Sequence, residues 1–196
     1  MNWYKKAQEV DYKGLHTAPT KDVGCSLDNL SSTYPEDIYS SEGARYYGHY
    51  GHGHPQDMFA VSVIRSCRNH PSKPVRVYRA VPYNPSPEEK INDLENQKRY
   101  ILKNGKIPPN AKTTLTNSSR YFDYLCDEIN KLKTLPTPDK MKFEINAGDW
   151  VTINRDYAKE HGESNLGGNY KIISKVVKAK DLYSDGDSIQ EWGYNP

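Results

Sequence analysis

The fold is decided by one stretch, Gly148-Asp149-Trp150-Val151-Thr152-Ile153-Asn154-Arg155-Asp156-Tyr157-Ala158-Lys159-Glu160-His161-Gly162. Its apolar first half predicts a short strand in which Trp150 and Thr152 share one face. Asn154 is a residue type that caps helices, and Gly162 suits the position just past a helix end. We therefore expect a strand that delivers a hydroxyl and passes directly into a short helix, which is a common way to wall a ligand cleft.

Length and composition limit the class of protein. The 196 residues are enough for one domain with a sizeable core. Hydrophobic residues make up only 35% of the chain and the mean hydropathy is −0.92, so we expect no membrane-spanning segment. The first lysines are followed by no apolar run, so no signal peptide is expected.

Charges and cysteines indicate the kind of partner and the compartment. The 27 basic and 25 acidic residues are interspersed and leave a formal charge of +2, which is not the basic stripe of a nucleic-acid-binding protein. A protein partner is therefore favoured over a nucleic acid. The three cysteines are widely spaced and fit neither a zinc site nor a disulfide framework, which favours a cytoplasmic setting.

The rest of the chain alternates between strand and helix patterns. Residues 20–56 are rich in loop-forming residues, and Asp57 is expected to cap a helix that runs to about residue 69. Its expected apolar face consists of Phe59, Ala60, Val63, Ile64 and Cys67. Residues 75–81 are the clearest strand, and alternation places Arg79 in line with its valines.

Two helices are expected in the middle third, at residues 86–105 and 118–133, the first with a capping box. Strands are then expected at residues 141–145, 170–179 and 188–194. This order predicts an α+β protein with a mostly antiparallel sheet and flanking helices. We expect a single domain over residues 1–196, with residues 84–140 as a helical-pair insertion.

Four signals could carry chemistry. The imidazoles of His49, His52 and His54 could bind a transition metal, or the Gly-rich tract could be a mobile surface loop. The guanidinium of Arg79 could bind a phosphate or carboxylate, or it could pair with a core acid or lie on an exposed sheet face. These observations leave both alternatives open for each signal.

The other two signals are Glu191 and His16. Glu191 lies between Ile189 and Trp192 on the last expected strand, where it could act chemically or be an ordinary edge-strand carboxylate. His16, in the extended segment of residues 14–19, could contact a ligand or be a hydrogen-bonded core histidine.

Taken together, the motifs resemble the ADP-ribosyltransferase superfamily. Its pattern is an Arg or His on an early strand, a Ser/Thr-bearing strand leading into a helix, and a Glu on a late strand. Here Val77-Tyr78-Arg79-Ala80-Val81, Asp149-Trp150-Val151-Thr152 and Gln190-Glu191-Trp192 stand in that order. The chain is similar to phage and bacterial proteins with YRAVP, GDWVT and EWGY motifs. The resemblance implies an ADP-ribosyltransferase-like split antiparallel sheet.

The resemblance also implies roles for individual residues, with NAD as the substrate. Glu191 would be the catalytic residue, accepting a hydrogen bond from the nicotinamide-ribose 2′-hydroxyl. Arg79 would anchor the dinucleotide and Thr152 would orient the glutamate. Tyr157 or His161 would stack on the nicotinamide.

The chain departs from the family pattern in several respects. The family's Ser-Thr-Ser strand is reduced to Thr152 followed by Asn154. Ile189 stands where transferases that modify arginine carry Glu or Gln, which argues against an arginine acceptor. His16 and Arg79 both fit the first motif. Arg79 is favoured by its spacing to the later motifs, and His16 could line the same cleft.

Three functions follow as hypotheses. The first is an NAD-dependent ADP-ribosyltransferase acting on a macromolecular acceptor in the cytoplasm, or in the host cytoplasm if the protein is encoded by a phage. The second is a non-catalytic module of the same fold that binds a host or viral protein. The third is a metal-dependent hydrolase that uses the histidine tract. One fold can host many functions, so the site itself has to decide among them.

Overall fold

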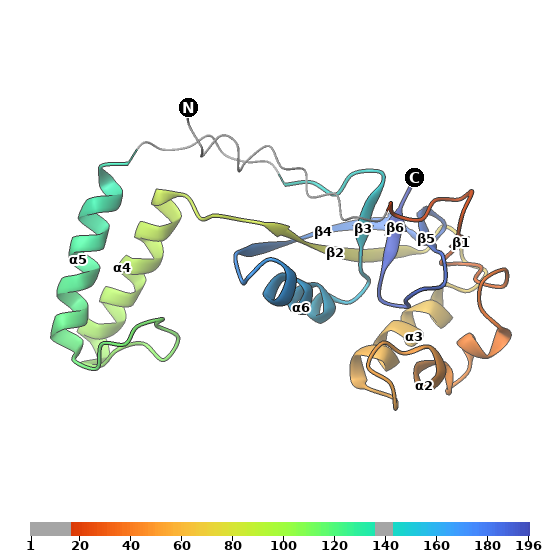
Figure 1. Ribbon diagram of the computed structural model, residues 1–196, viewed down its shortest axis with the longest axis horizontal. Coiled ribbons are helices and arrows are strands. Elements are labelled where there is room, and N and C mark those ends of the chain that lie inside the picture. The colour runs from red at the N-terminus through yellow and green to blue at the C-terminus, as the bar shows by residue number, and fades with distance from the viewer. Residues whose placement is uncertain (1–16, 136–142) are drawn as a thin grey trace. The chain divides into compact units, whose positions relative to one another are not determined.

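The 148–162 stretch forms strand β3 (Asp149–Val151) and helix α6 (Arg155–Asn165) in the computed structural model, which describes residues 17–135 and 143–196 (Figure 1). The expected cap is confirmed, because the Asn154 side chain accepts a hydrogen bond of 3.0 Å from the backbone N–H of Asp156. The chain therefore passes from strand to helix within three residues, and this fixes the direction in which α6 leaves the sheet.

The prediction that Gly162 lies just past the helix end is wrong. Gly162 is inside α6, and a Cβ atom there would collide with the ring of Tyr170. The glycine is needed because the aromatic ring packs directly on the helix backbone. The helix ends before Gly167, whose φ of 60° lies in the left-handed region that favours glycine.

Two antiparallel sheets make up the strand framework. The first has four strands in the order β1-β5-β6-β3, with β1 (Cys25–Ser26), β5 (Leu182–Ser184) and β6 (Trp192–Tyr194). The second pairs β2 (Pro74–Pro82) with β4 (Tyr170–Lys178) along their full lengths. Helix α6 packs against β2 and β4 (Figure 1). The expected α+β class with antiparallel strands is confirmed.

The two sheets meet at Thr152. Strand β3 pairs with β6 as far as Val151, opposite Trp192, and one residue later Thr152 pairs with Tyr78 of β2. Backbone hydrogen bonds of 2.8 and 2.9 Å run both ways between Tyr78 and Thr152. We call this junction the seam. It places Thr152, the residue directly after β3, between the two sheets.

The N-terminal part of the chain contributes short helices that the sequence pattern did not indicate. They are η1 (Glu36–Tyr39) and α2 (Gly43–Tyr47), and both precede α3 (Pro55–Cys67). A further 3-10 turn, η2 (Ala179–Asp181), joins β4 to β5. The expectation that residues 20–56 are loop-rich therefore holds only in part. These helices of four and five residues are too short to produce a periodic sequence pattern, so the sequence did not predict them.

Helix α3 differs from its expected form at its start and on its buried face. The cap is His54, whose side chain accepts from the N–H of Gln56, and not Asp57. The expected burial of Phe59 is also wrong, because its side chain is 49% exposed. The buried positions of the helix are Asp57, Ala60, Val61, Ile64 and Cys67.

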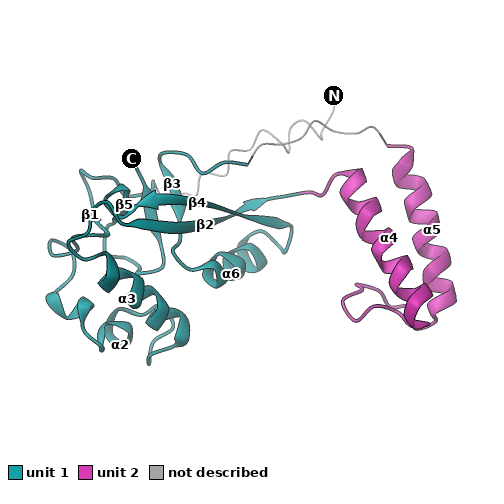
Figure 2. Ribbon diagram, turned by 180° about the vertical axis from the view of Figure 1, so that it is seen from behind, with its two compact units in different colours: residues 1–83, 143–196 teal, residues 84–142 magenta. Residues whose placement is uncertain are grey.

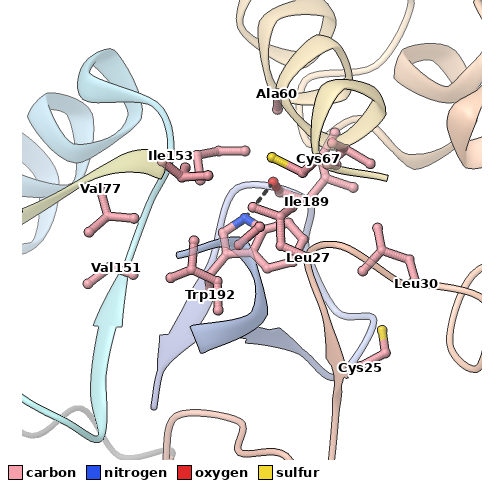
Figure 3. Close-up of a cluster of buried hydrophobic side chains, with 14 of the residues drawn as sticks. Cys25, Leu27, Leu30, Ala60, Cys67, Val77, Val151, Ile153, Ile189 and Trp192 are labelled. Carbon is pink, nitrogen blue, oxygen red and sulfur yellow. Dashed lines mark hydrogen bonds between the residues drawn. The ribbon is translucent and has the colours of Figure 1, made fainter. Parts of the chain in front are cut away.

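The core of this part of the chain surrounds Trp192, which is fully buried (Figure 3). Its indole N–H donates a hydrogen bond of 3.1 Å to the carbonyl of Ile189. The ring lies among side chains from the N-terminal segment, α3 and β3, of which Figure 3 labels Leu27, Cys67 and Val151. Because residues 189 and 192 are both buried, the backbone on either side of Glu191 is fixed by packing.

Residues 84–142 form a second compact unit, separate from the unit of residues 1–83 and 143–196 (Figure 2). It contains the two expected helices, α4 (Pro87–Asn104) and α5 (Ser118–Lys133). The predicted capping box is present at Ser86 and Glu89. The two helices enclose a small buried cluster of their own, made of Ile101, Tyr121 and Leu125.

Two expected strands differ from the structure. Phe143–Ile145 is not a strand, and residues 141 and 142 lie outside the described residues. The last strand begins at Trp192, so Glu191 immediately precedes β6 and does not lie within it. In the described part of the chain, no helix has the length and apolar character needed to cross a membrane.

Candidate active site

Glu191 has a partly exposed side chain between buried neighbours. Gln190 and Trp192 are fully buried, whereas Glu191 is of intermediate exposure. Glu191 immediately precedes β6, and of these three consecutive side chains it is the one that reaches the surface. The chain therefore presents this carboxylate to solvent from a rigidly packed backbone.

Tyr157 holds the Glu191 carboxylate. Its hydroxyl donates a hydrogen bond of 2.9 Å to Oε1 of Glu191 from the first turn of α6. Burial raises the pKa of the Tyr157 phenol, and the nearby charge and hydrogen bond of Glu191 raise that pKa further. The phenol thus stays protonated at neutral pH and acts as the donor, with the carboxylate as the acceptor.

Thr152 lies next to Glu191 in the strand register. Val151, the last residue of β3, is paired with Trp192, so Thr152 and Glu191 are the next residues of the two segments, and alternation places them on the same side. Its side chain is 4% exposed, and Oγ1 accepts a hydrogen bond of 3.1 Å from the N–H of Asn154. The hydroxyl therefore fixes the bend between β3 and α6, and through α6 it fixes the position of Tyr157.

Arg79 lies on the other face of the seam. Tyr78 and Thr152 are cross-strand partners and share a face, so Arg79, the next residue of β2, points to the opposite side. There its guanidinium forms an ion pair with the carboxylate of Asp149 on β3. The two side chains are only 16% and 17% exposed. The structure therefore brings Glu191, Tyr157 and Thr152 to one face and Arg79 to the other.

His161 and His16 complete the predicted set. His161 lies one helical turn beyond Tyr157 on α6, and its Nδ1 is 2.9 Å from the side-chain nitrogen of Asn165. His16 lies outside the described residues, so its position relative to Glu191 stays a prediction. Its neighbours Ala18 and Pro19 are buried, and the backbone of Pro19 lies so close to Gly193 that a Cβ atom there would collide with it.

A histidine- and tyrosine-bearing loop, residues 48–54, lies beside Tyr157. The ring of His49 makes an edge-to-face contact with Tyr157 at 5.5 Å and another with Tyr50 at 4.9 Å. The hydroxyl of Tyr50 donates to the carboxylate of Glu160 on α6. Burial, followed by this hydrogen bond, raises the pKa of Tyr50. Two tyrosine–carboxylate pairs therefore flank the imidazole of His49.

The 48–54 loop does not have the geometry of a metal site. Among residues 17–135 and 143–196, no group of three or more His, Cys, Asp or Glu side chains is arranged to hold a metal ion. The ring of His54 instead packs on Tyr50, with centroids 4.5 Å apart. The loop is a structured aromatic surface beside α6.

Sequence reasoning missed Asp57 as a site residue. Its carboxylate is fully buried and accepts hydrogen bonds from the 48–54 loop and from Gln190. The sequence pattern predicted that Asp57 caps a helix, and that local role gave no indication of its hydrogen bonds to the 48–54 loop and Gln190. Tyr50 and Glu160 were missed because their pairing joins parts of the chain that are far apart in sequence.

A hollow of about 360 Å³ lies elsewhere in the same unit. It is lined by residues 143–147, Ile173, Lys175 and Tyr194, among others. Ile173 is the cross-strand partner of Arg79, and Tyr194 is that of Asp149, so the hollow lies on the Arg79 face. Since Glu191 and Tyr157 face the other side, we place the candidate site at Glu191 on its hydrogen bonds and not at the hollow.

Comparisons with protein-family models, curated proteins and solved structures yield no match to this chain.

Proposed function

We infer that the chain is an NAD-dependent ADP-ribosyltransferase, which transfers ADP-ribose from NAD to a macromolecular acceptor and releases nicotinamide. One observation carries the proposal: the partly exposed Glu191 carboxylate is oriented by the phenol of Tyr157 next to the seam. The order of Arg79, Thr152 and Glu191 along the chain, which resembles the family pattern, supports the same function. The meeting of two antiparallel sheets at Thr152 is compatible with the split sheet of that fold.

The groups around Glu191 suit the nicotinamide ribose of NAD. Oε1 of Glu191 receives the hydrogen bond from Tyr157, and we assign Oε2 to the ribose 2′-hydroxyl. The ring of Tyr157, which bonds Glu191, contacts the ring of His49, and His49 in turn contacts the ring of Tyr50. A carboxylate for the sugar and flat side chains for the nicotinamide are the groups that this end of NAD requires.

In the reaction, the bond between ribose C1′ and the nicotinamide nitrogen breaks, and its electron pair leaves with neutral nicotinamide. Positive charge develops on C1′ and the ring oxygen as the bond lengthens. A fixed carboxylate at Glu191 stabilises this charge more in the transition state than in the ground state, which is the condition for catalysis. The acceptor then forms a bond to C1′ and releases its proton. Glycosidases use carboxylates to stabilise the same kind of positive charge in their transition states.

The remaining residues have supporting roles in this proposal. Thr152 orients Glu191 through the bend into α6, and Tyr157 holds the carboxylate in place through its hydrogen bond to Oε1. His161, on the same helix, is the alternative stacking partner for nicotinamide. Anchoring of the dinucleotide by Arg79 or His16 stays a prediction, because the observed partner of Arg79 is Asp149 and His16 is not described.

The proposed acceptor is a protein in the cytoplasm of the producing cell or, for a phage protein, of its host. Incubation of the purified protein with NAD labelled in the adenylate and with a cell lysate tests this directly. We expect label in macromolecules with the wild-type chain and none with Glu191→Gln. Absence of NAD consumption and of any thermal shift with NAD would overturn the proposal in favour of a non-catalytic binding module.

A further inference from the structure

The carboxylate of Asp57 joins two segments of the candidate site. Oδ1 accepts hydrogen bonds from the N–H of His49 at 3.0 Å and from the side-chain amide of Gln190 at 3.0 Å. Oδ2 accepts from the N–H of Tyr50 at 2.9 Å and of Gly51 at 3.2 Å. One buried carboxylate therefore binds three consecutive backbone amides of the 48–54 loop and the residue directly before Glu191.

The environment of Asp57 is built for this arrangement. The residue is 0% exposed in the first turn of α3, where the helix dipole favours a negative charge. A Cβ atom at Gly48 would overlap both Oδ2 of Asp57 and the carbonyl oxygen of Ala44. Gly48 has an ordinary φ of −67°, so the glycine is required for space and not for backbone conformation.

Gln190 connects Asp57 to the catalytic segment. It is fully buried, and its amide nitrogen donates to Oδ1 of Asp57 at 3.0 Å and to the carbonyl of Gln56 at 3.3 Å. Gln190 and Glu191 are consecutive in the chain, so fixing the buried side chain of Gln190 fixes the backbone from which Glu191 projects. The same carboxylate thus sets the position of both the loop and Glu191.

We propose that Asp57 is a positioning residue that holds the 48–54 loop against the Glu191 segment, so that His49 and Tyr50 form one side of the site. The catalytic part of this inference rests on the proposed ADP-ribosyltransferase function. The structural part does not, because it concerns the amides of His49, Tyr50 and Gly51 whatever the site binds. The loop is then an ordered part of the site and not a mobile surface loop.

Amide hydrogen exchange tests the structural part. In the wild-type chain, the amides of His49, Tyr50 and Gly51 should exchange at least about tenfold more slowly than unprotected amides. In Asp57→Asn they should exchange at unprotected rates, while the ladder amides of β2 and β4 keep their protection. Unprotected loop amides in the wild type, or protection that survives Asp57→Asn, would overturn the inference.

Two further variants keep the test decisive if Asp57→Asn does not fold. Gly48→Ala should release the same three amides by steric overlap, with no change of charge. His52→Ala is the matched control, because it changes the exposed tip of the loop and leaves the Asp57 contacts intact. If Gly48→Ala leaves the loop amides as protected as His52→Ala does, Asp57 does not hold the loop.

Nicotinamide release tests the catalytic part. Gln190→Met removes the donor to Asp57 but leaves the loop bonds, so we expect a fall in kcat of about tenfold with the loop amides still protected. An unchanged kcat would overturn the link from Asp57 to Glu191. A wild-type protein that consumes no NAD would instead refute the proposed function, while the exchange rates would still decide whether Asp57 holds the loop.

Discussion

The two faces of the seam hold their charged residues in different ways. On one face, Arg79 is paired with Asp149, and both side chains are largely buried. On the other face, Glu191 is partly exposed and is held by the neutral hydroxyl of Tyr157. The ion pair of Arg79 with Asp149 joins β2 to β3. The carboxylate of Glu191 is instead oriented by a neutral donor, which leaves Oε2 for a ligand in the proposed function.

This difference shows how neighbouring motifs can serve different purposes. Arg79 and Tyr78 are adjacent in sequence, but strand alternation sends them to opposite faces. The motif order alone placed Arg79 and Glu191 in one cleft, and the register at Thr152 separates their faces. Replacing one residue at a time on each face tests whether the separation holds.

The largest effect on stability is expected on the Arg79 face. Arg79→Met leaves the carboxylate of Asp149 in a poorly solvated position without its guanidinium, and we expect a loss of about 3 kcal/mol in the free energy of unfolding. Asp149→Asn should cost a similar amount. Urea denaturation of both single variants and the double variant gives the coupling energy, which should be clearly non-zero. Additive losses would mean that the two side chains do not depend on each other.

A smaller effect is expected on the Glu191 face. Tyr157→Phe keeps the ring that contacts His49 and removes the hydrogen bond to Glu191, so we expect a stability loss of about 1.5 kcal/mol. If the proposed function holds, the less constrained carboxylate should also reduce nicotinamide release by about tenfold. Full activity in Tyr157→Phe would show that Glu191 is oriented by other contacts.

The hydroxyl of Thr152 should contribute less to the free energy of unfolding than the Arg79–Asp149 ion pair or the hydrogen bond of Tyr157. Thr152→Val keeps the shape of the side chain and removes the acceptor for the N–H of Asn154, which should cost about 1 kcal/mol. Thr152→Ser, which keeps the hydroxyl, is the matched control. Equal thermal stability of the Val and Ser variants would mean that the hydroxyl does not fix the bend between β3 and α6.

The smallest effect is expected in the pH dependence of stability. The pKa of Tyr157 is raised above the usual value of a tyrosine, about 10, so above about pH 10 the unfolded chain loses this phenol proton while the folded chain keeps it. The stability that the protonated phenol provides is complete below pH 10 and falls as the pH rises. Denaturation of the wild type and of Tyr157→Phe between pH 8 and about pH 11 should show a shallower decline in the variant; parallel declines would contradict the assignment.

The sequence was most informative where the structure depends on nearby residues. The strand before Asn154, the Asn154 cap and the helix after it follow from local propensity, and so does the capping box of Ser86 with Glu89. The end of α6 was misjudged at Gly162, because that glycine makes room for Tyr170 and does not end the helix. A residue type alone does not distinguish these two uses.

Long-range contacts were not accessible from the sequence. Asp57 has the chemistry of a helix cap, and its bonds to Gln190 become visible only when the two segments are placed together. The pairing of Arg79 with an acid was one of two alternatives to a ligand role, but naming Asp149 required the register of β2 with β3. The pairing of Tyr50 with Glu160 carries no sequence signal either.

The most direct test of the central claim is the rate of nicotinamide release from NAD by the wild type and by Glu191→Gln. The amide keeps the size of the side chain and an oxygen that can accept from Tyr157, but it carries no charge. We expect kcat to fall by at least about a hundredfold with an unchanged melting temperature, because only the transition state loses a stabilising charge. Turnover within a factor of about two of the wild type would contradict the assignment of Glu191 as the catalytic residue.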